Sequence, residues 1–217
     1  MCGRYVLVSP GEVIAEHFGL DEVPVYPPRY NIAPTQHALV VRETPAGERE
    51  ALMLRWGLVP AWAKDPAIGS RMINARAEGL ADKPAFRAAF RRRRCLVPAD
   101  GFYEWSPVAG GRKQPYFVRL VSGAPLALAG LWEEWRSPAG DAIATFTIVT
   151  TGANEALRTI HDRMPVLIAP ADYDEWLSSP NPSALLAPWA GEPFELRPVS
   201  LRVNSVQNDA PGLLERV

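Results

Sequence analysis

The stretch CLVPADGFYEWSPVAGGRKQPYFVRLVSGAPLALAGLWEEW, residues 95–135, decides the fold class. It alternates apolar and aromatic runs with short turns that contain Gly or Pro, a pattern typical of consecutive β-strands. Because short turns join neighbouring strands in the antiparallel sense, the runs predict antiparallel pairing. The expected strands in and just after this stretch cover residues 95–99, 101–106, 116–121, 126–135 and 144–151.

The flanking segments add further strands and short helices. Ser9 is expected to cap a helix that begins at Pro10, with Glu12 completing a capping box. A second short helix is expected from Pro84 into the arginine run 91–94. The remaining expected strands cover residues 37–42, 51–56 and 165–169, and the remaining short helices cover 154–160 and 170–177.

Strands and helices that do not alternate regularly favour the α+β class. We expect a curved, mostly antiparallel, barrel-like sheet with flanking short helices. The sequence contains no internal repeat and no linker, which predicts a single domain over residues 1–217.

The composition is that of an ordinary soluble globular protein, with 47% hydrophobic and 22% charged residues. Lys and Arg total 23 and Asp and Glu total 24, so the net charge of −1 excludes a polybasic, histone-like protein. A local basic patch remains compatible with nucleic-acid binding. Most of the basic residues are arginines, which favour forked contacts to phosphate.

Cys2 and Cys95 are the only cysteines, so the sequence is not a disulfide scaffold, and it has no Cys/His metal spacing. We expect no metal and no cofactor. The first residues lack a secretory signal, and no apolar run approaches the roughly 18 residues of a membrane span. A monomer in the reducing cytoplasm, associated with the nucleoid when bound to DNA, is the expectation.

Cys2 directly follows the initiator methionine. Once Met1 is removed, the residue carries both an amine of pKa about 8 and a thiol two carbons away. The amine can attack an aldehyde to give a Schiff base, and the thiol can then close a five-membered thiazolidine ring. The alternative is that Cys2 is a small buried hydrophobic residue.

Glu104 lies in the expected strand GFYEW, where both faces carry aromatic residues. A carboxylate covered on both sides needs a partner or a raised pKa, and such acids cluster at functional sites. The alternative is a structural carboxylate paired with an arginine.

His161 stands between a helix and a strand, where its neighbour Asp162 could set its tautomer; it could instead be a surface histidine. Asn74 could hold a backbone group or an amine, or could cap a helix. The arginine run 91–94 is typical either of a nucleic-acid patch or of a solvated helix end. Cys95 opens an apolar strand and is expected in the core.

Taken together, several segments resemble the SRAP (SOS response-associated peptidase) domain family. The matching stretches are MCGRY (1–5), RYNIAPT (29–35), WGLVP (56–60), INARAE (73–78), GFYEW (101–105), IHDRMP (160–165) and VNSVQN (203–208). They occur in the family's order and span nearly the whole chain.

The resemblance implies an SRAP-like fold and covalent attachment to abasic sites in single-stranded DNA through a thiazolidine formed by the N-terminal cysteine. The catalytic residues that it implies are Cys2, Asn74, Glu104 and His161. The DNA-binding residues that it implies are Arg4, Asn31, Pro34, Trp62, Arg76 and Arg163. The family often has an aromatic pair near Trp62, where this chain has one aromatic residue in PAWA (60–63).

Two other classes of function remain open. Cys2, Glu104 and His161 could serve as an N-terminal-nucleophile cysteine peptidase or amidohydrolase, with self-removal of Met1 as its minimal activity. A non-covalent DNA-binding module with a buried Cys2 is the third possibility.

Overall fold

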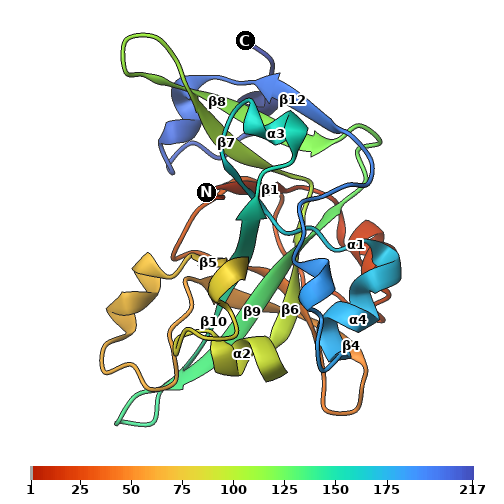
Figure 1. Ribbon diagram of the computed structural model, residues 1–217, viewed down its shortest axis with the longest axis vertical. Coiled ribbons are helices and arrows are strands. Elements are labelled where there is room, and N and C mark those ends of the chain that lie inside the picture. Colours follow the sequence, from red (N-terminus) through yellow and green to blue (C-terminus); the bar gives the residue numbers. More distant parts are fainter. Residues whose placement is uncertain (1) are drawn as a thin grey trace.

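The computed structural model describes residues 2–217, and their strands form two sheets (Figure 1). The first sheet, at the top of Figure 1, has the strand order β12-β8-β7-β1-β2, and all its pairings are antiparallel. Its strands are β1 (Tyr5–Leu7), β2 (Arg29–Ile32), β7 (Gly101–Pro107), β8 (Lys113–Leu120) and β12 (Phe194–Pro198).

The second sheet closes on itself. Its order is β11-β10-β4-β3-β6-β9, and β9 also pairs with β10, so the strands β10-β4-β3-β6-β9 form a ring. Its strands are β3 (His37–Glu43), β4 (Arg49–Trp56), β5 (Asn74–Arg76), β6 (Arg94–Ala99), β9 (Leu126–Arg136), β10 (Ala142–Gly152) and β11 (Arg163–Pro165). Two pairings, β10 with β4 and β10 with β5, are parallel, and the others are antiparallel. The expected curved, mostly antiparallel, barrel-like core is therefore confirmed.

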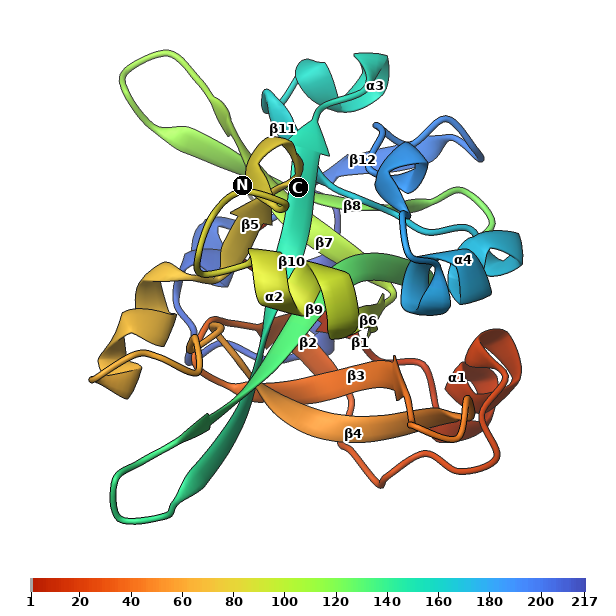
Figure 2. The ribbon, with the colours of Figure 1, turned by 60° about the horizontal axis from the view of Figure 1, so that its bottom comes forward.

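Short helices flank the sheets. The α-helices are α1 (Gly11–Phe18), α2 (Arg87–Arg92), α3 (Glu155–Arg158) and α4 (Tyr173–Ser178). The 3-10 helices are η1 (Pro66–Arg71), η2 (Ala77–Gly79), η3 (Pro170–Asp172), η4 (Ser183–Leu185), η5 (Leu201–Asn204) and η6 (Pro211–Leu214). Helices α1 and α4 lie side by side, because the rings of Phe18 and Tyr173 stack with centroids 5.4 Å apart (Figures 1 and 2). Within residues 2–217, no helix combines the length and the apolar character that a membrane crossing requires.

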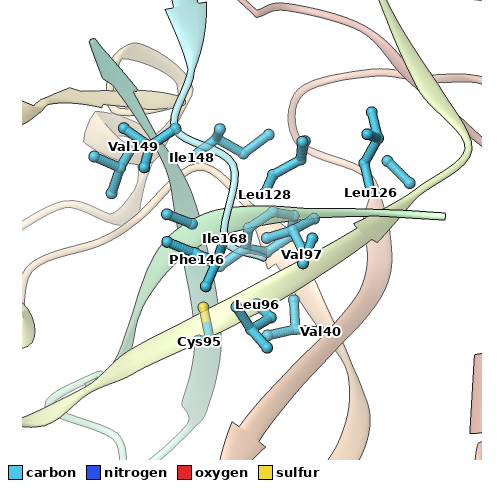
Figure 3. Packing of buried hydrophobic residues seen from close by; sticks show 14 of the residues in the cluster. Val40, Cys95, Leu96, Val97, Leu126, Leu128, Phe146, Ile148, Val149 and Ile168 are labelled. Carbon is cyan, nitrogen blue, oxygen red and sulfur yellow. The ribbon is translucent and has the colours of Figure 1, made fainter. Parts of the chain in front are cut away.

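The main core fills the barrel, and Cys95 packs there among aliphatic side chains, as Figure 3 shows. Its side chain has no exposed surface, so the expectation of a core role for Cys95 is confirmed. Gly130 lies opposite Cys95 in the β6–β9 pair, and a Cβ there would approach the Cys95 sulfur to 2.8 Å. The absence of a side chain at Gly130 therefore lets the Cys95 thiol fit inside the barrel.

Two local expectations were wrong. Helix α1 begins at Gly11, with Pro10 in the cap position and no side-chain cap, because the Ser9 hydroxyl donates to Asp100 instead. The expected strand over 165–169 is displaced, since β11 covers Arg163–Pro165. The Ser9 hydroxyl is therefore not available to cap α1, because it is hydrogen-bonded to the Asp100 carboxylate.

The arginine run does not form one solvated helix end. Helix α2 ends at Arg92, and Arg93 pairs with Glu133 at 2.6 Å. Arg94 is buried, and its guanidinium donates to backbone carbonyls that include those of Phe90 and Ser179. Because neutral carbonyls satisfy this buried cation, Arg94 joins α2 to the end of α4 and is not part of an exposed basic patch.

Candidate active site

Cys2 is fully buried just before β1, beside the first residue of β5. The Asn74 side chain donates from Nδ2 to the Cys2 carbonyl oxygen at 2.8 Å. Asn74 is held there because β5 pairs with β10, with Ile148 opposite Asn74. The Asn74 Oδ1 atom is buried and accepts no hydrogen bond from the residues that the structure describes, which leaves an acceptor beside the Cys2 backbone.

Glu104 approaches the same segment from β7. The Tyr103 N–H donates to the Arg4 carbonyl at 2.9 Å, and Phe102 lies opposite Tyr5 in the β1–β7 pair. The expected alternation holds, because Phe102 packs in the barrel core and Tyr103 packs in a separate cluster on the other face. Glu104 is 1% exposed, so its carboxylate faces the protein interior.

The pKa shifts place Cys2, Glu104 and His161 in one electrostatic group. Burial raises the pKa of Glu104, whereas a positive charge on His161 lowers it. Burial also raises the pKa of the Cys2 thiol far above its ordinary value, and the negative charge of Glu104 raises it further. At neutral pH, Cys2 is therefore a thiol and not a thiolate, so its use as a nucleophile requires a nearby base.

His161 follows α3 and is half-buried. The backbone N–H of Arg163 donates to His161 Nδ1 at 3.0 Å, which favours the neutral tautomer that carries its proton on Nε2. The Asp162 carboxylate lies 3.0 Å from the same Nδ1 and becomes an ion-pair partner when the ring is protonated. Both contacts therefore lie on the Nδ1 side of the ring.

Arg4 and Asn31 hold the C-terminal loop 203–208 against β1 and β2. The Arg4 guanidinium donates to Asn31 Oδ1 at 3.2 Å and to the Val203 carbonyl at 2.8 Å. Asn31 is fully buried, and its Nδ2 donates to the carbonyls of Val203, Ser205 and Asn208. Both side chains therefore fix the loop, and Asn31 presents no surface of its own.

Arg76 and Arg163 lie on two strands, β5 and β11, that each pair with β10. Thr150 of β10 lies opposite Arg76 of β5, and Gly152 lies opposite Arg163 of β11. Arg76 is exposed, whereas the Arg163 side chain is 14% exposed and forms a forked ion pair with Glu78. The Arg76 guanidinium is therefore accessible to a ligand, whereas the Arg163 guanidinium is mostly buried and already paired.

Pro34 and Trp62 belong to two separate loops. Trp62 is 60% exposed, and Pro34 is half-buried. Thr35, next to Pro34, has a φ of 72°, which a β-branched residue rarely adopts. Its N–H donates to the Trp56 carbonyl at 2.8 Å, so the strained turn at Pro34 is anchored to the end of β4.

Reasoning from the sequence missed two residues that shape this region. Asp209 accepts hydrogen bonds from the backbone N–H groups of Tyr30 and Asn31, which closes the C-terminal loop onto β2. Glu78 pairs with Arg163. Glu78 lies within the INARAE stretch, two residues after Arg76, so its charge beside a candidate phosphate ligand was the available signal. Nothing local in the sequence marks Asp209.

Comparisons with known proteins show what this chain is similar to. The family model described as SOS response associated peptidase (SRAP) matches residues 1–206. The Abasic site processing protein YoqW of Bacillus subtilis (strain 168) is 43% identical over 223 residues, which cover 99% of each chain. The Abasic site processing protein YoaM of the same organism is also 43% identical, over 99% of this chain and 98% of its own.

A crystal structure of a protein from Bacteroides thetaiotaomicron superposes with a TM-score of 0.88 over the whole of both chains. At 22% identity, that likeness shows the fold alone. The sequence match over residues 1–206 and the full-length relatives together carry the assignment: this chain belongs to the SRAP family.

Proposed function

We propose that this protein senses and shields abasic sites in single-stranded DNA by forming a thiazolidine crosslink through Cys2. Two observations carry the proposal. Asn74 donates a hydrogen bond to the Cys2 carbonyl, and the charge of Glu104 acts on the Cys2 thiol and is itself influenced by His161. The family assignment and the relatives named as abasic site processing proteins support it.

The chemistry needs no group beyond those of the chain and the lesion. The Cys2 amine adds to the aldehyde of the ring-opened sugar, and loss of water gives an imine. The Cys2 sulfur then bonds to the imine carbon, and the thiol proton is transferred to the nitrogen. The product is a five-membered ring that contains both heteroatoms of Cys2.

Each neighbouring side chain has a role that fits its position. During imine formation Glu104 carries a proton from the Cys2 amine to the departing hydroxyl. It then carries the proton of the thiol, whose pKa burial has raised, to the imine nitrogen as the ring closes. His161 acts on the sugar oxygen to open the closed hemiacetal, because an imidazole can both donate and accept a proton. Asn74 fixes the Cys2 backbone and so aims the amine.

The DNA strand is held by arginines and apolar contacts. Arg4, Arg76 and Arg163 each lie two residues from a proposed catalytic residue, so they would contact phosphates on both sides of the lesion. Pro34 and Trp62 would pack on bases and exclude a paired strand. Asn31 would act indirectly, by holding the loop that Arg4 also contacts.

The protein removes its own Met1 in this account, and it acts as a monomer where single-stranded DNA is exposed, in the nucleoid. Peptide hydrolysis by the same residues is the second candidate, favoured by the juxtaposition of a thiol with a carboxylate and an imidazole.

One experiment separates the classes of function. Purified protein is mixed with single-stranded DNA that carries one abasic site and is run on a denaturing gel. A shifted band supports the crosslink, peptide cleavage without a shift supports the hydrolase, and neither outcome supports a non-covalent module. Intact DNA of the same sequence is the control and should give no shifted band.

A further inference from the structure

Glu78 occupies the fork of Arg163 at the edge of the proposed DNA surface. It lies in η2, which directly follows β5. Arg163 Nη1 donates to Glu78 Oε1 at 2.5 Å and Nη2 donates to Oε2 at 3.0 Å, while Nη2 also donates to the Thr150 carbonyl at 2.6 Å. Both terminal nitrogens of Arg163 are therefore already engaged.

The pair is electrically neutral under ordinary conditions. Hydrogen bonding from Arg163 lowers the pKa of Glu78 below its usual value, and the charges of Arg163 and Arg76 lower it further. The carboxylate side chain is 59% exposed, whereas that of Arg163 is 14% exposed. A ligand that approaches from solvent meets the anion before it meets the cation.

Arg4 and Arg76 differ from Arg163 in this respect. The Arg4 guanidinium contacts the neutral Asn31 amide oxygen and the backbone carbonyls of Val203 and Asn204, so its charge is not cancelled. Arg76 is exposed. Of the three arginines beside the proposed catalytic residues, Arg163 alone is held in a forked ion pair among the residues that the structure describes.

We propose that Glu78 limits the affinity for single-stranded DNA by holding the fork that a backbone phosphate would otherwise take. This inference rests on the proposed function and deepens it. A phosphate that contacts Arg163 must displace Glu78, so undamaged strands gain little from this site. The crosslinking step at Cys2 is then the main source of discrimination for the lesion.

The test measures equilibrium binding of intact single-stranded DNA to Cys2→Ala protein across a salt series. Arg4 and Arg76, the two arginines outside the forked ion pair, predict a slope of log affinity against log salt of about −1.4 for single strands, since each neutralised phosphate contributes about 0.7. Glu78→Gln should steepen the slope to about −2.1. The ratio of the Glu78→Gln affinity to the parent affinity should then increase about fivefold for each tenfold reduction in salt concentration.

Glu50→Gln is the matched control. Glu50 pairs with Arg42 at 2.7 Å through a carboxylate side chain that is 41% exposed, and its substitution changes the net charge equally. It should leave the slope near that of the parent. In the double variant Glu78→Gln/Arg163→Ala, the slope should return to about −1.4 because the freed cation is gone.

The outcomes are distinguishable. A Glu78→Gln slope that matches that of Glu50→Gln, or weaker binding by a Glu78→Gln protein with an unchanged melting temperature, would overturn the role of Glu78. Parent protein whose binding shows no salt response would instead remove the arginine surface from the proposed function. If Glu78→Gln lowers the melting temperature, Glu78→Asp, which keeps the charge, should bind with the parent slope; a steeper slope would contradict the inference.

Discussion

At the scale of single residues, the proposed chemistry depends on a thiol and a carboxylate that are both withdrawn from water. Burial raises the pKa values of Cys2 and Glu104, so each group holds its proton more tightly than it would in solvent. A carboxyl whose pKa is raised towards neutrality is a better proton donor and acceptor at working pH. His161 adds a charge that lowers the pKa of Glu104, which links their protonation states.

Removal of either acid–base group should slow the reaction without unfolding the protein. We expect Glu104→Gln and His161→Ala each to reduce the rate of adduct formation about 10²–10⁴-fold, the usual effect of losing such a group. Timed denaturing gels give the rate. Glu133→Gln alters another buried glutamate, paired with Arg93, and should leave the rate unchanged. An unfolded Glu104→Gln protein would show that the carboxylate is structural.

Glu104 also predicts how stability depends on pH. Its pKa is raised in the folded state above the ordinary 4.5, so the folded protein binds this proton more tightly than the unfolded chain does. The stabilising contribution is therefore present below pH 4.5 and is lost as the pH rises through the folded pKa. The melting temperature of Glu104→Gln relative to wild type should rise from pH 4.5 upward. A melting temperature of Glu104→Gln that falls relative to that of wild type as the pH rises would contradict the raised pKa.

At the scale of elements, the long strands were predictable and the short ones were not. Strands such as β9 and β10 are long runs rich in apolar residues and bounded by turns, so they can be read from the sequence. The three-residue strands β1, β5 and β11 have no period to detect, and β5 and β11 form because β10 offers an edge on each side. Asn74 lies in β5 and Arg163 lies in β11. The family resemblance could therefore name these candidate site residues, whereas the local sequence pattern could not predict the strands that hold them.

The turn after β4 provides a prediction for one element. Gly57 has a φ of 123°, and a Cβ there would lie 2.5 Å from the Gly69 carbonyl oxygen of η1. Gly57→Ala should therefore cost about 3 kcal/mol, since both backbone strain and a clash with main chain oppose it. Urea denaturation measures this cost. Gly47→Ala is the control, because Gly47 has a φ of 83° and open space around its Cα; an equal loss there would show that the contact with η1 is unimportant.

At the scale of the whole molecule, a net charge of −1 coexists with a proposed DNA surface because the open cations are local. Arg4 and Arg76 lie near the junction of the two sheets, and much of the arginine elsewhere is neutralised, as in the Arg42–Glu50 and Arg49–Asp174 pairs. The net charge of the chain therefore does not predict DNA binding, because binding depends on which arginines are neutralised by ion pairs and where the others lie.

Strand preference follows from the same surface. Intact duplex DNA should bind Cys2→Ala protein more weakly than single-stranded DNA does, because a paired strand would collide with Pro34 and with Trp62, whose ring is 60% exposed. Trp62→Ala should reduce the difference in affinity between single-stranded and duplex DNA. Fluorescence anisotropy can measure the affinity for both forms of DNA. Val25→Ala removes another exposed apolar side chain and is the control. If Cys2→Ala protein with Trp62 intact binds single-stranded and duplex DNA with equal affinity, strand exclusion by Pro34 and Trp62 is contradicted.

The central claim is that Cys2 itself, freed from Met1, closes a ring on the lesion. The intact mass of the purified adduct tests it most directly, together with peptide mapping of the attachment point. The account predicts the mass of the chain without Met1 plus that of the abasic DNA, less one water, with attachment at Cys2 and no adduct from Cys2→Ala. An adduct that retains Met1, or one that maps to any other residue, would contradict it.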